Sequence, residues 1–222
     1  MRIVYEDQWL IVVDKPSGLL TMSTGRPGEE TAYSMVTAYT GRIFIVHRLD
    51  RDTSGLLVFA KDHETKLALQ ENWSEAVLER KYAAVLEGYI EDEDGWIETW
   101  LYDNPKSMKV HCYGLRPGDT PDNAPRKDWH FAATHCHTLE RLTIHGRPYT
   151  KVEFELETGR KNQLRAHAGW IGHPIAGDGK YGAVSDPFGR LALHACTLSF
   201  IHPWTGRTMR FNSNHTSFAN RT

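Results

Sequence analysis

The residues best suited to chemistry lie in one short stretch, His47-Arg48-Leu49-Asp50-Arg51-Asp52. It leads through Thr53-Ser54-Gly55 into the apolar run Leu56–Ala60. Charged side chains next to an apolar core are costly unless they are paired, and loops at strand ends often carry catalytic groups. The stretch is therefore either a structural ion-pair cluster or an active site, and charge pattern alone does not decide between them.

One chemistry open to this stretch is glycoside hydrolysis by a pair of carboxylates. Asp50 and Asp52 are two residues apart, so on an extended strand they share one face with about 6.6 Å between their backbones. Glycoside hydrolases use carboxylate separations in this range. Thr53-Ser54-Gly55 bends the chain directly afterwards, and no second acidic pair lies near a predicted cleft. We therefore keep hydrolysis by Asp50 and Asp52 as the alternative interpretation.

The elements around this stretch predict a domain of mixed α and β structure. The short run Leu56–Ala60 indicates a strand buried on both faces. Asp62 is a plausible N-cap for a helix that continues to about Trp73. Further strands are expected at Ile3–Asp7, Trp9–Val13, Ile43–Val46 and Arg80–Gly88, and a helix at Glu30–Tyr39 that ends at Gly41.

The second half of the chain predicts two more hairpins and a helix. Thr138–Arg147 pairs with Thr150–Leu156, and Leu198–Ile201 pairs with Thr208–Phe211. Gly159 is expected to form the tight turn before a helix over Gln163–Ile171. Residues 103–129 are rich in Pro, Gly and Asn, which predicts loops. That segment is either a surface insertion, which we favour, or a site of RNA contact.

Three segments resemble the signature motifs of the RluA-type pseudouridine synthases. They are His47–Lys61, the strand Arg80–Gly88, and Glu157-Thr158-Gly159-Arg160-Lys161-Asn162-Gln163-Leu164-Arg165-Ala166-His167. The resemblance extends to Lys15-Pro16-Ser17-Gly18, Gly172–Asp178, Lys180-Tyr181-Gly182 and Leu193-His194-Ala195. Asn162 stands where many members of that family have histidine. The resemblance implies one pseudouridine synthase catalytic domain over residues 1–222, without an additional RNA-binding module. The implied fold is α+β, with a mixed, largely antiparallel sheet that bends around a cleft and is flanked by helices.

The resemblance also implies a role for several residues. It names Asp50 as the catalytic carboxylate, Arg165 as the arginine that keeps Asp50 ionised, and Tyr82 as the ring against the uracil. Arg48 would fill the space that a flipped base leaves. Leu193 would pack on the uracil, and Arg160 and Lys161 would contact RNA. Apart from the resemblance, Arg165 could be an ordinary surface arginine, and Tyr82 and Leu193 could be packing residues.

Composition gives weaker indications than the motifs. The net charge is −2, so an RNA partner requires a local basic patch, which we expect around Arg48, Arg147, Lys151, Arg160 and Lys161. Three cysteines without a Cys-x-x-Cys pattern suit a reducing cytoplasm, and we expect a monomer. His130, His135, Cys136 and His137 lack the second ligand pair of a zinc site, so we expect no metal.

Pseudouridine formation breaks the N1–C1′ bond of a uridine, rotates the uracil and rejoins it through C5. The product is an isomer of the substrate, so the reaction needs no cofactor. Asp50 could attack the sugar as a nucleophile, or stabilise an oxocarbenium-like sugar and remove a ribose proton. A non-catalytic RNA-binding module remains a third interpretation, but it would not need Asp50, Tyr82 and Arg165 together.

Overall fold

The computed structural model describes residues 1–71 and 73–214, except for the side chain of Ser74. Contacts between Cα atoms divide the chain into two compact units. The first holds Met1–Lys81 and residues 193–214, and the second holds Tyr82–Ala192. No helix within the described residues is long and apolar enough to cross a membrane.

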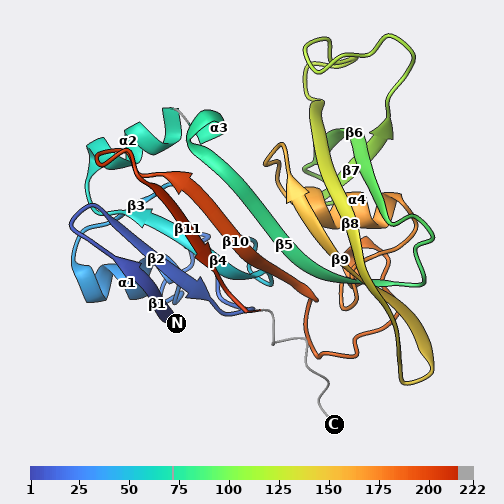
Figure 1. Ribbon diagram of the computed structural model, residues 1–222, viewed down its shortest axis with the longest axis horizontal. Helices are drawn as coiled ribbons and strands as arrows, with labels where there is room; N and C mark the ends of the chain where they lie inside the picture. The colour runs from blue at the N-terminus through green and yellow to red at the C-terminus, as the bar shows by residue number, and fades with distance from the viewer. Residues whose placement is uncertain (72, 215–222) are drawn as a thin grey trace. The chain divides into compact units, whose positions relative to one another are not determined.

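The first unit is built on a mixed sheet in the order β1-β2-β4-β10 (Figure 1). Strand β2 pairs antiparallel with both β1 and β4, whereas β10 runs parallel to β4 and antiparallel to β11. The short β3 also pairs with β4. These strands span Arg2–Glu6 (β1), Leu10–Lys15 (β2), Phe44–Ile45 (β3), Ser54–Ala60 (β4), Leu193–Ile201 (β10) and Thr208–Asn212 (β11).

Every residue of β4 is buried, as the apolar run predicted, because β2 and β10 flank it and the helix over His63–Glu71 packs against it. Helix α2, His63–Glu71, begins as expected after Asp62, whose carboxylate accepts the Thr65 N–H at 2.7 Å. The short α3, Trp73–Ala76, follows. The core of the unit unites the strands with α2 through Leu10, Val12, Val46, Leu56, Val58, Ala60, Leu69, Leu198 and Phe200.

Helix α1, Ala32–Thr40, has a defined beginning and end. Thr31 and Ser34 form a capping box, in which each side chain bonds the backbone N–H of the other. Gly41 ends the helix with φ 88°, a conformation that glycine adopts readily. The predicted helix over Glu30–Tyr39 is thus confirmed with slightly later boundaries.

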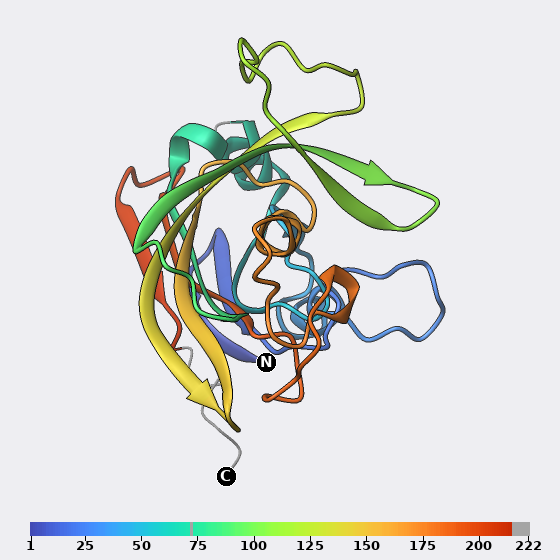
Figure 2. The same ribbon diagram turned by 90° about the vertical axis from the view of Figure 1, so that its right-hand side faces the viewer.

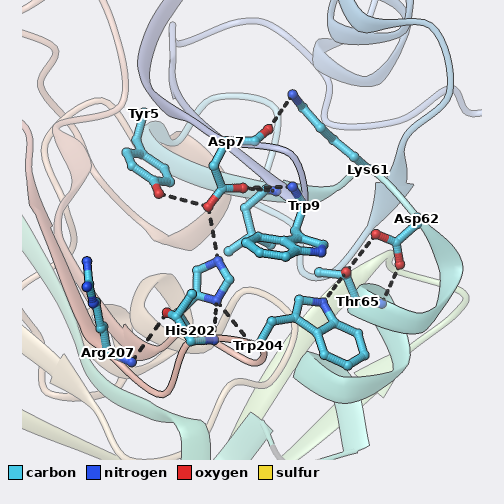
Figure 3. A network of polar contacts seen from close by, with 11 residues as sticks. Tyr5, Asp7, Trp9, Lys61, Asp62, Thr65, His202, Trp204 and Arg207 are labelled. Atoms are coloured by element: carbon cyan, nitrogen blue, oxygen red, sulfur yellow. Dashed lines mark hydrogen bonds and ion pairs between the residues drawn. The ribbon is translucent and has the colours of Figure 1, made fainter.

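A polar network closes the end of this unit where the β1–β2 turn lies (Figure 3). One Asp7 oxygen accepts from the Trp9 and Leu10 N–H groups, and the other from Tyr5 and His202. Burial alone would raise the pKa of Asp7, but these hydrogen bonds outweigh it and lower the pKa below its ordinary value. The network therefore fixes the first hairpin to the β10–β11 turn.

The second unit contains an antiparallel sheet in the order β5-β9-β8-β6-β7. Its strands are β5 Val77–Glu87, which begins in the first unit, β6 Asp94–Asn104, β7 Lys109–Gly114, β8 His130–Ile144 and β9 Arg147–Leu156. Helix α4, Gln163–Trp170, and the 3-10 turn η1, Gly179–Tyr181, lie against β6, β7 and β8 (Figure 2). Their shared core consists of Leu101, Val110, Ala132, Ala166 and Tyr181.

One prediction about local structure is wrong, and another is confirmed only over a shorter range. Residues 103–129 are not loop throughout, because β6 continues to Asn104 and Lys109–Gly114 forms β7. The pairing of β7 with β6 overrides the weak local preference of this segment. The strand expected over Ile43–Val46 is limited to Phe44–Ile45.

Candidate active site

Asp50 lies in the loop that joins β3 to β4, and the backbone of this loop is held on both sides of it. Thr21 donates its hydroxyl to the Leu49 carbonyl at 2.7 Å and accepts the Leu49 N–H at 3.2 Å. Ser17 donates to the Asp52 carbonyl at 2.7 Å. Asp50 itself is half-buried. Its carboxylate is therefore presented by a backbone that is fixed before any substrate arrives.

Buried Lys15 also holds the backbone of the Asp50 loop. Its side chain is fully buried, and its Nζ donates to the carbonyls of Pro16 (3.0 Å), Leu19 (2.7 Å) and Arg51 (3.0 Å). An ammonium group has three protons, so three carbonyls can compensate for much of its lost hydration. The Arg51 carbonyl also accepts the Gly18 N–H at 3.0 Å. We call Lys15, Ser17, Gly18 and Thr21 the cradle of the Asp50 loop.

The sequence analysis did not identify the cradle. No role was predicted for any residue of Lys15-Pro16-Ser17-Gly18. A lysine next to a buried strand is usually exposed, so the sequence carries no signal for its burial. Only the contact between residues 15–21 and 49–52 shows what the segment does.

A buried hydrogen-bonded chain fixes the first residue of β4. Ser213 donates to the Asp14 carboxylate at 2.6 Å, so its oxygen accepts from His194 Nε2 at 3.0 Å. The other ring nitrogen, Nδ1, then accepts the Ser54 hydroxyl at 2.8 Å. This order assigns the Nε2–H tautomer to His194. Ser54, His194 and Ser213 are each less than 5% exposed.

Gly55 makes this arrangement possible. It has φ 113°, and a Cβ built on it would lie 2.3 Å from the Ala195 carbonyl oxygen. The parallel strands β4 and β10 pair here, with Ser54 opposite His194 and Gly55 opposite Ala195. Leu193, the residue before His194, is 3% exposed. Its predicted contact with a uracil stays a prediction.

Arg48 is exposed, while the residue before it is anchored. His47 Nε2 accepts the Val58 N–H at 3.2 Å, and its ring packs on Trp73 with 5.1 Å between centroids. Burial, and then the positive charge of Arg80, lower the pKa of His47 to about 3. The ring is therefore neutral at pH 7, which agrees with its role as an acceptor.

The carboxylate of Asp52 is bound by its neighbour Arg51, with Nε–Oδ1 at 2.9 Å and Nη2–Oδ2 at 3.3 Å. A general acid or base needs a carboxylate directed at the substrate. The ion pair with Arg51 therefore weighs against a hydrolase that uses Asp50 and Asp52.

Arg165 lies on α4, and its side chain is 11% exposed. Its Nε and Nη2 bind the two oxygens of buried Asp178 at 2.7 and 2.8 Å, a bidentate pair. The guanidinium also lies 5.2 Å from the Tyr181 ring centroid. Arg165 is therefore not a surface arginine. Asp50 and Arg165 belong to different units, and a pairing between them stays a prediction.

The motif Thr158–Arg165 forms a turn that is fixed by Gln163. This buried side chain accepts from the Thr158 hydroxyl and the Arg160 N–H at 2.8 and 2.9 Å, and donates to the Ala133 carbonyl. Asn162, not Gly159, adopts the left-handed conformation, with φ 51°. Asparagine tolerates this conformation well. Its amide also donates to the Tyr181 hydroxyl at 3.3 Å.

The other residues of the second unit that were predicted to contact uracil or RNA do not form one cluster. Tyr82 is half-buried on β5. Arg160 donates to the Phe131 carbonyl at 3.1 Å, and Lys161 pairs with Asp103 at 2.6 Å. Arg147 begins β9, whereas Arg160 and Lys161 follow its other end, so these cations spread along the strand.

The histidines of β8 bind a carboxylate. His135 Nε2 and His137 Nδ1 lie 2.9 and 3.2 Å from the two oxygens of Asp94. Within residues 1–71 and 73–214, no group of three or more His, Cys, Asp or Glu side chains is arranged to hold a metal ion. The pair with Asp94 accounts for these two histidines.

This fold occurs in solved structures of RNA-modifying enzymes. Human RNA Pseudouridylate Synthase Domain Containing 1 aligns with a TM-score of 0.77 and 26% sequence identity, over 96% of this chain and 82% of its own. Human RNA Pseudouridylate Synthase Domain Containing 4 has the same fold, with a TM-score of 0.73. The α+β class and the largely antiparallel sheet predicted from the sequence are confirmed.

Residues 9–170 match the family of RNA pseudouridylate synthases, and the chain belongs to this family of isomerases. YlyB of Bacillus subtilis, named an RNA pseudouridine synthase, is 36% identical over 96% of this chain and 68% of its own length. Ribosomal large subunit pseudouridine synthase D of Neisseria meningitidis is 36% identical, and this chain spans 58% of it. The dual-specificity RNA pseudouridine synthase RluA of Vibrio vulnificus is 33% identical over 91% of this chain.

Proposed function

We propose that this chain converts uridine to pseudouridine in structured RNA, with Asp50 as the reacting carboxylate. The N1–C1′ bond breaks, a C5–C1′ bond forms, and the proton lost from C5 is balanced by one gained at N1. The observation that supports this proposal is the cradle, which fixes the backbone on both sides of Asp50. Such rigidity suits a group that must meet one sugar carbon in one geometry.

The roles proposed for other residues follow their matched motifs. Arg48, which is exposed, fills the place of the flipped uridine; extruding a base costs a few kcal/mol. Tyr82 stacks on the uracil and Leu193 lines its pocket. Arg165 keeps Asp50 ionised, and Arg160 and Lys161 contact phosphates. No cofactor or metal is required, because substrate and product are isomers.

We further propose ribosomal RNA as the substrate class, with transfer RNA as the alternative. The names of the synthase D relatives support the first, since they specify the large ribosomal subunit. We propose that the protein acts in the cytoplasm as a monomer on its RNA.

The direct test is Asp50→Asn, assayed by tritium release from RNA that carries 5-tritiated uridine. We expect loss of product with RNA binding and the fold retained. Asp52→Asn is the matched control, and it should keep most activity because Asp52 is paired with Arg51. Activity of Asp50→Asn within tenfold of the unmodified protein would refute the assignment. Equal losses in both variants would favour a carboxylate pair instead.

A further inference from the structure

The segment between β7 and β8, residues 115–129, extends beyond the ends of both strands (Figures 1 and 2). It is ordered by its own contacts. The Asp119 carboxylate accepts from the indole Nε1 of Trp100 at 2.9 Å and from the Arg116 N–H at 3.0 Å. Asn123 accepts the Thr120 N–H at 2.7 Å. The segment is therefore a built structure anchored to the sheet at Trp100, which is fully buried.

Two aromatic rings stack where this segment returns to the sheet. Tyr113, on β7, and Trp129 have ring centroids 4.1 Å apart and an interplanar angle of 14°. The guanidinium carbon of Arg126 lies 5.3 Å from the Trp129 centroid. We call Tyr113, Arg126 and Trp129 the aromatic stack. Tyr113 remains 38% exposed although it belongs to a strand.

Burial of Trp100 explains Asp119, but it does not explain the aromatic stack. The stack leaves a large ring partly in water, and within the described residues no hydrogen-bond partner is recorded for the Tyr113 hydroxyl. A flat ring held rigid by a second ring offers a stacking surface at little entropic cost.

Charged side chains of both signs lie around this surface: the segment carries Asp119, Asp122 and Asp128 beside its three cations, so its net charge is zero. Arg116, Arg126 and Lys127 belong to the segment itself, and all three are exposed. Arg160 is brought near by its bond to the Phe131 carbonyl, two residues after Trp129. Exposed cations beside a stacking surface match the two chemical faces of a nucleotide, its phosphate and its base.

We propose that the aromatic stack binds an unpaired base of the substrate RNA, outside the residues that handle the target uridine. This proposal rests on the function proposed above. Stacking on an aromatic ring is tolerant of base identity, because every base has a π face. Bases within a duplex are already stacked on each other, so the site selects single-stranded nucleotides that flank the modified position.

The test compares Tyr113→Leu with the unmodified protein in binding a short single-stranded oligouridylate. Removal of one stacking interaction should raise the dissociation constant about 5- to 150-fold. Tyr113→Phe keeps the ring and should bind normally. Trp96→Leu is the matched control, since Trp96 is 57% exposed and packs on His135 at 5.0 Å elsewhere in the same unit. Its affinity should not change.

A Tyr113→Leu protein that folds and binds as tightly as the unmodified protein would overturn the proposal. Should Tyr113→Leu fail to fold, RNA that contains 5-iodouridine provides a second test. Irradiation should cross-link the unmodified protein at Tyr113 or Trp129, and cross-links found only elsewhere would overturn the proposal. The proposed function is tested separately: it fails if the unmodified protein makes no pseudouridine, whereas the stack alone fails if the unmodified protein makes pseudouridine and Tyr113→Leu binds the oligouridylate with an unchanged dissociation constant.

Discussion

Replacement of Lys15 by methionine should weaken the support of the Asp50 loop while the rest of the fold is retained. Methionine has a similar length but cannot donate a hydrogen bond. The carbonyls of Pro16 and Leu19 would lose the Lys15 donor, whereas the Arg51 carbonyl would keep the Gly18 N–H. The backbone beside Asp50 would then be held less firmly.

The magnitude follows from these contacts. A buried acceptor without a partner costs about 1–3 kcal/mol, so two cost about 2–6 kcal/mol. Methionine also removes the cost of burying an ammonium group, which offsets about half of this loss. We expect a net loss of about 1–3 kcal/mol in the free energy of unfolding. The catalytic rate should fall further, by about 100-fold, since small displacements of a reacting group are costly.

Urea unfolding measures the first quantity, and single-turnover tritium release at saturating RNA measures the second. Lys61→Met is the control, because Lys61 Nζ binds Glu6 and the Asp7 carbonyl at the other end of β4. Its rate should not change. If Lys15→Met retained both its stability and a rate within threefold of the unmodified protein, the cradle would not position Asp50.

Three further predictions concern RNA and pH. Arg48→Ala should slow single-turnover reaction on a stem-loop by about 100-fold, but much less on RNA whose target uridine is already unstacked; equal losses on both would exclude a flipping role. RNA affinity should fall steeply with salt despite the net charge of −2, and a salt-independent dissociation constant would contradict the phosphate contacts. Burial lowers the pKa of His167 to about 4 in the folded protein, whereas in the unfolded chain it stays near 6.5. Between these two pH values the unfolded chain binds the proton more readily than the folded protein does, so the free energy of unfolding should fall as pH drops from 6.5 towards 4. His167→Gln should remove about 2 kcal/mol of that loss at pH 5 in urea titrations, and an unchanged pH profile would show that His167 is not responsible.

Much of the first unit could be predicted from the sequence because its strands and helix ends are specified by residues close together in the chain. The run Leu56–Ala60 is short, apolar and entered through a glycine, and these features alone indicate a buried strand. The Asp62 cap and the Gly41 stop depend on neighbours within one helical turn. Asp50 was named as the catalytic carboxylate by the resemblance to the RluA-type motif, and this role stays a prediction.

Contacts between distant segments could not be predicted in the same way. His194 is 140 residues from Ser54, and nothing in either sequence segment specifies that they pair. Lys15 shows the same limit, since burial of an ammonium group depends on three carbonyls supplied by the folded chain. Asn162 stands where many members of the family have histidine, and no role was predicted for it. It proves to be the residue with positive φ at the turn, where the sequence favoured Gly159.

The residues that position Asp50 differ in exposure from the residues proposed to bind RNA. Asp50 is held through the backbone of its loop by buried Lys15 and Thr21 and by half-buried Ser17, so its position does not depend on RNA. Arg48 and Tyr113 of the aromatic stack are exposed, so an RNA substrate can reach them. Changes in the cradle should therefore lower kcat at saturating RNA with little effect on affinity. Changes in the aromatic stack should raise the dissociation constant and leave the chemical step intact, so kinetics of the two sets of variants can distinguish positioning from binding.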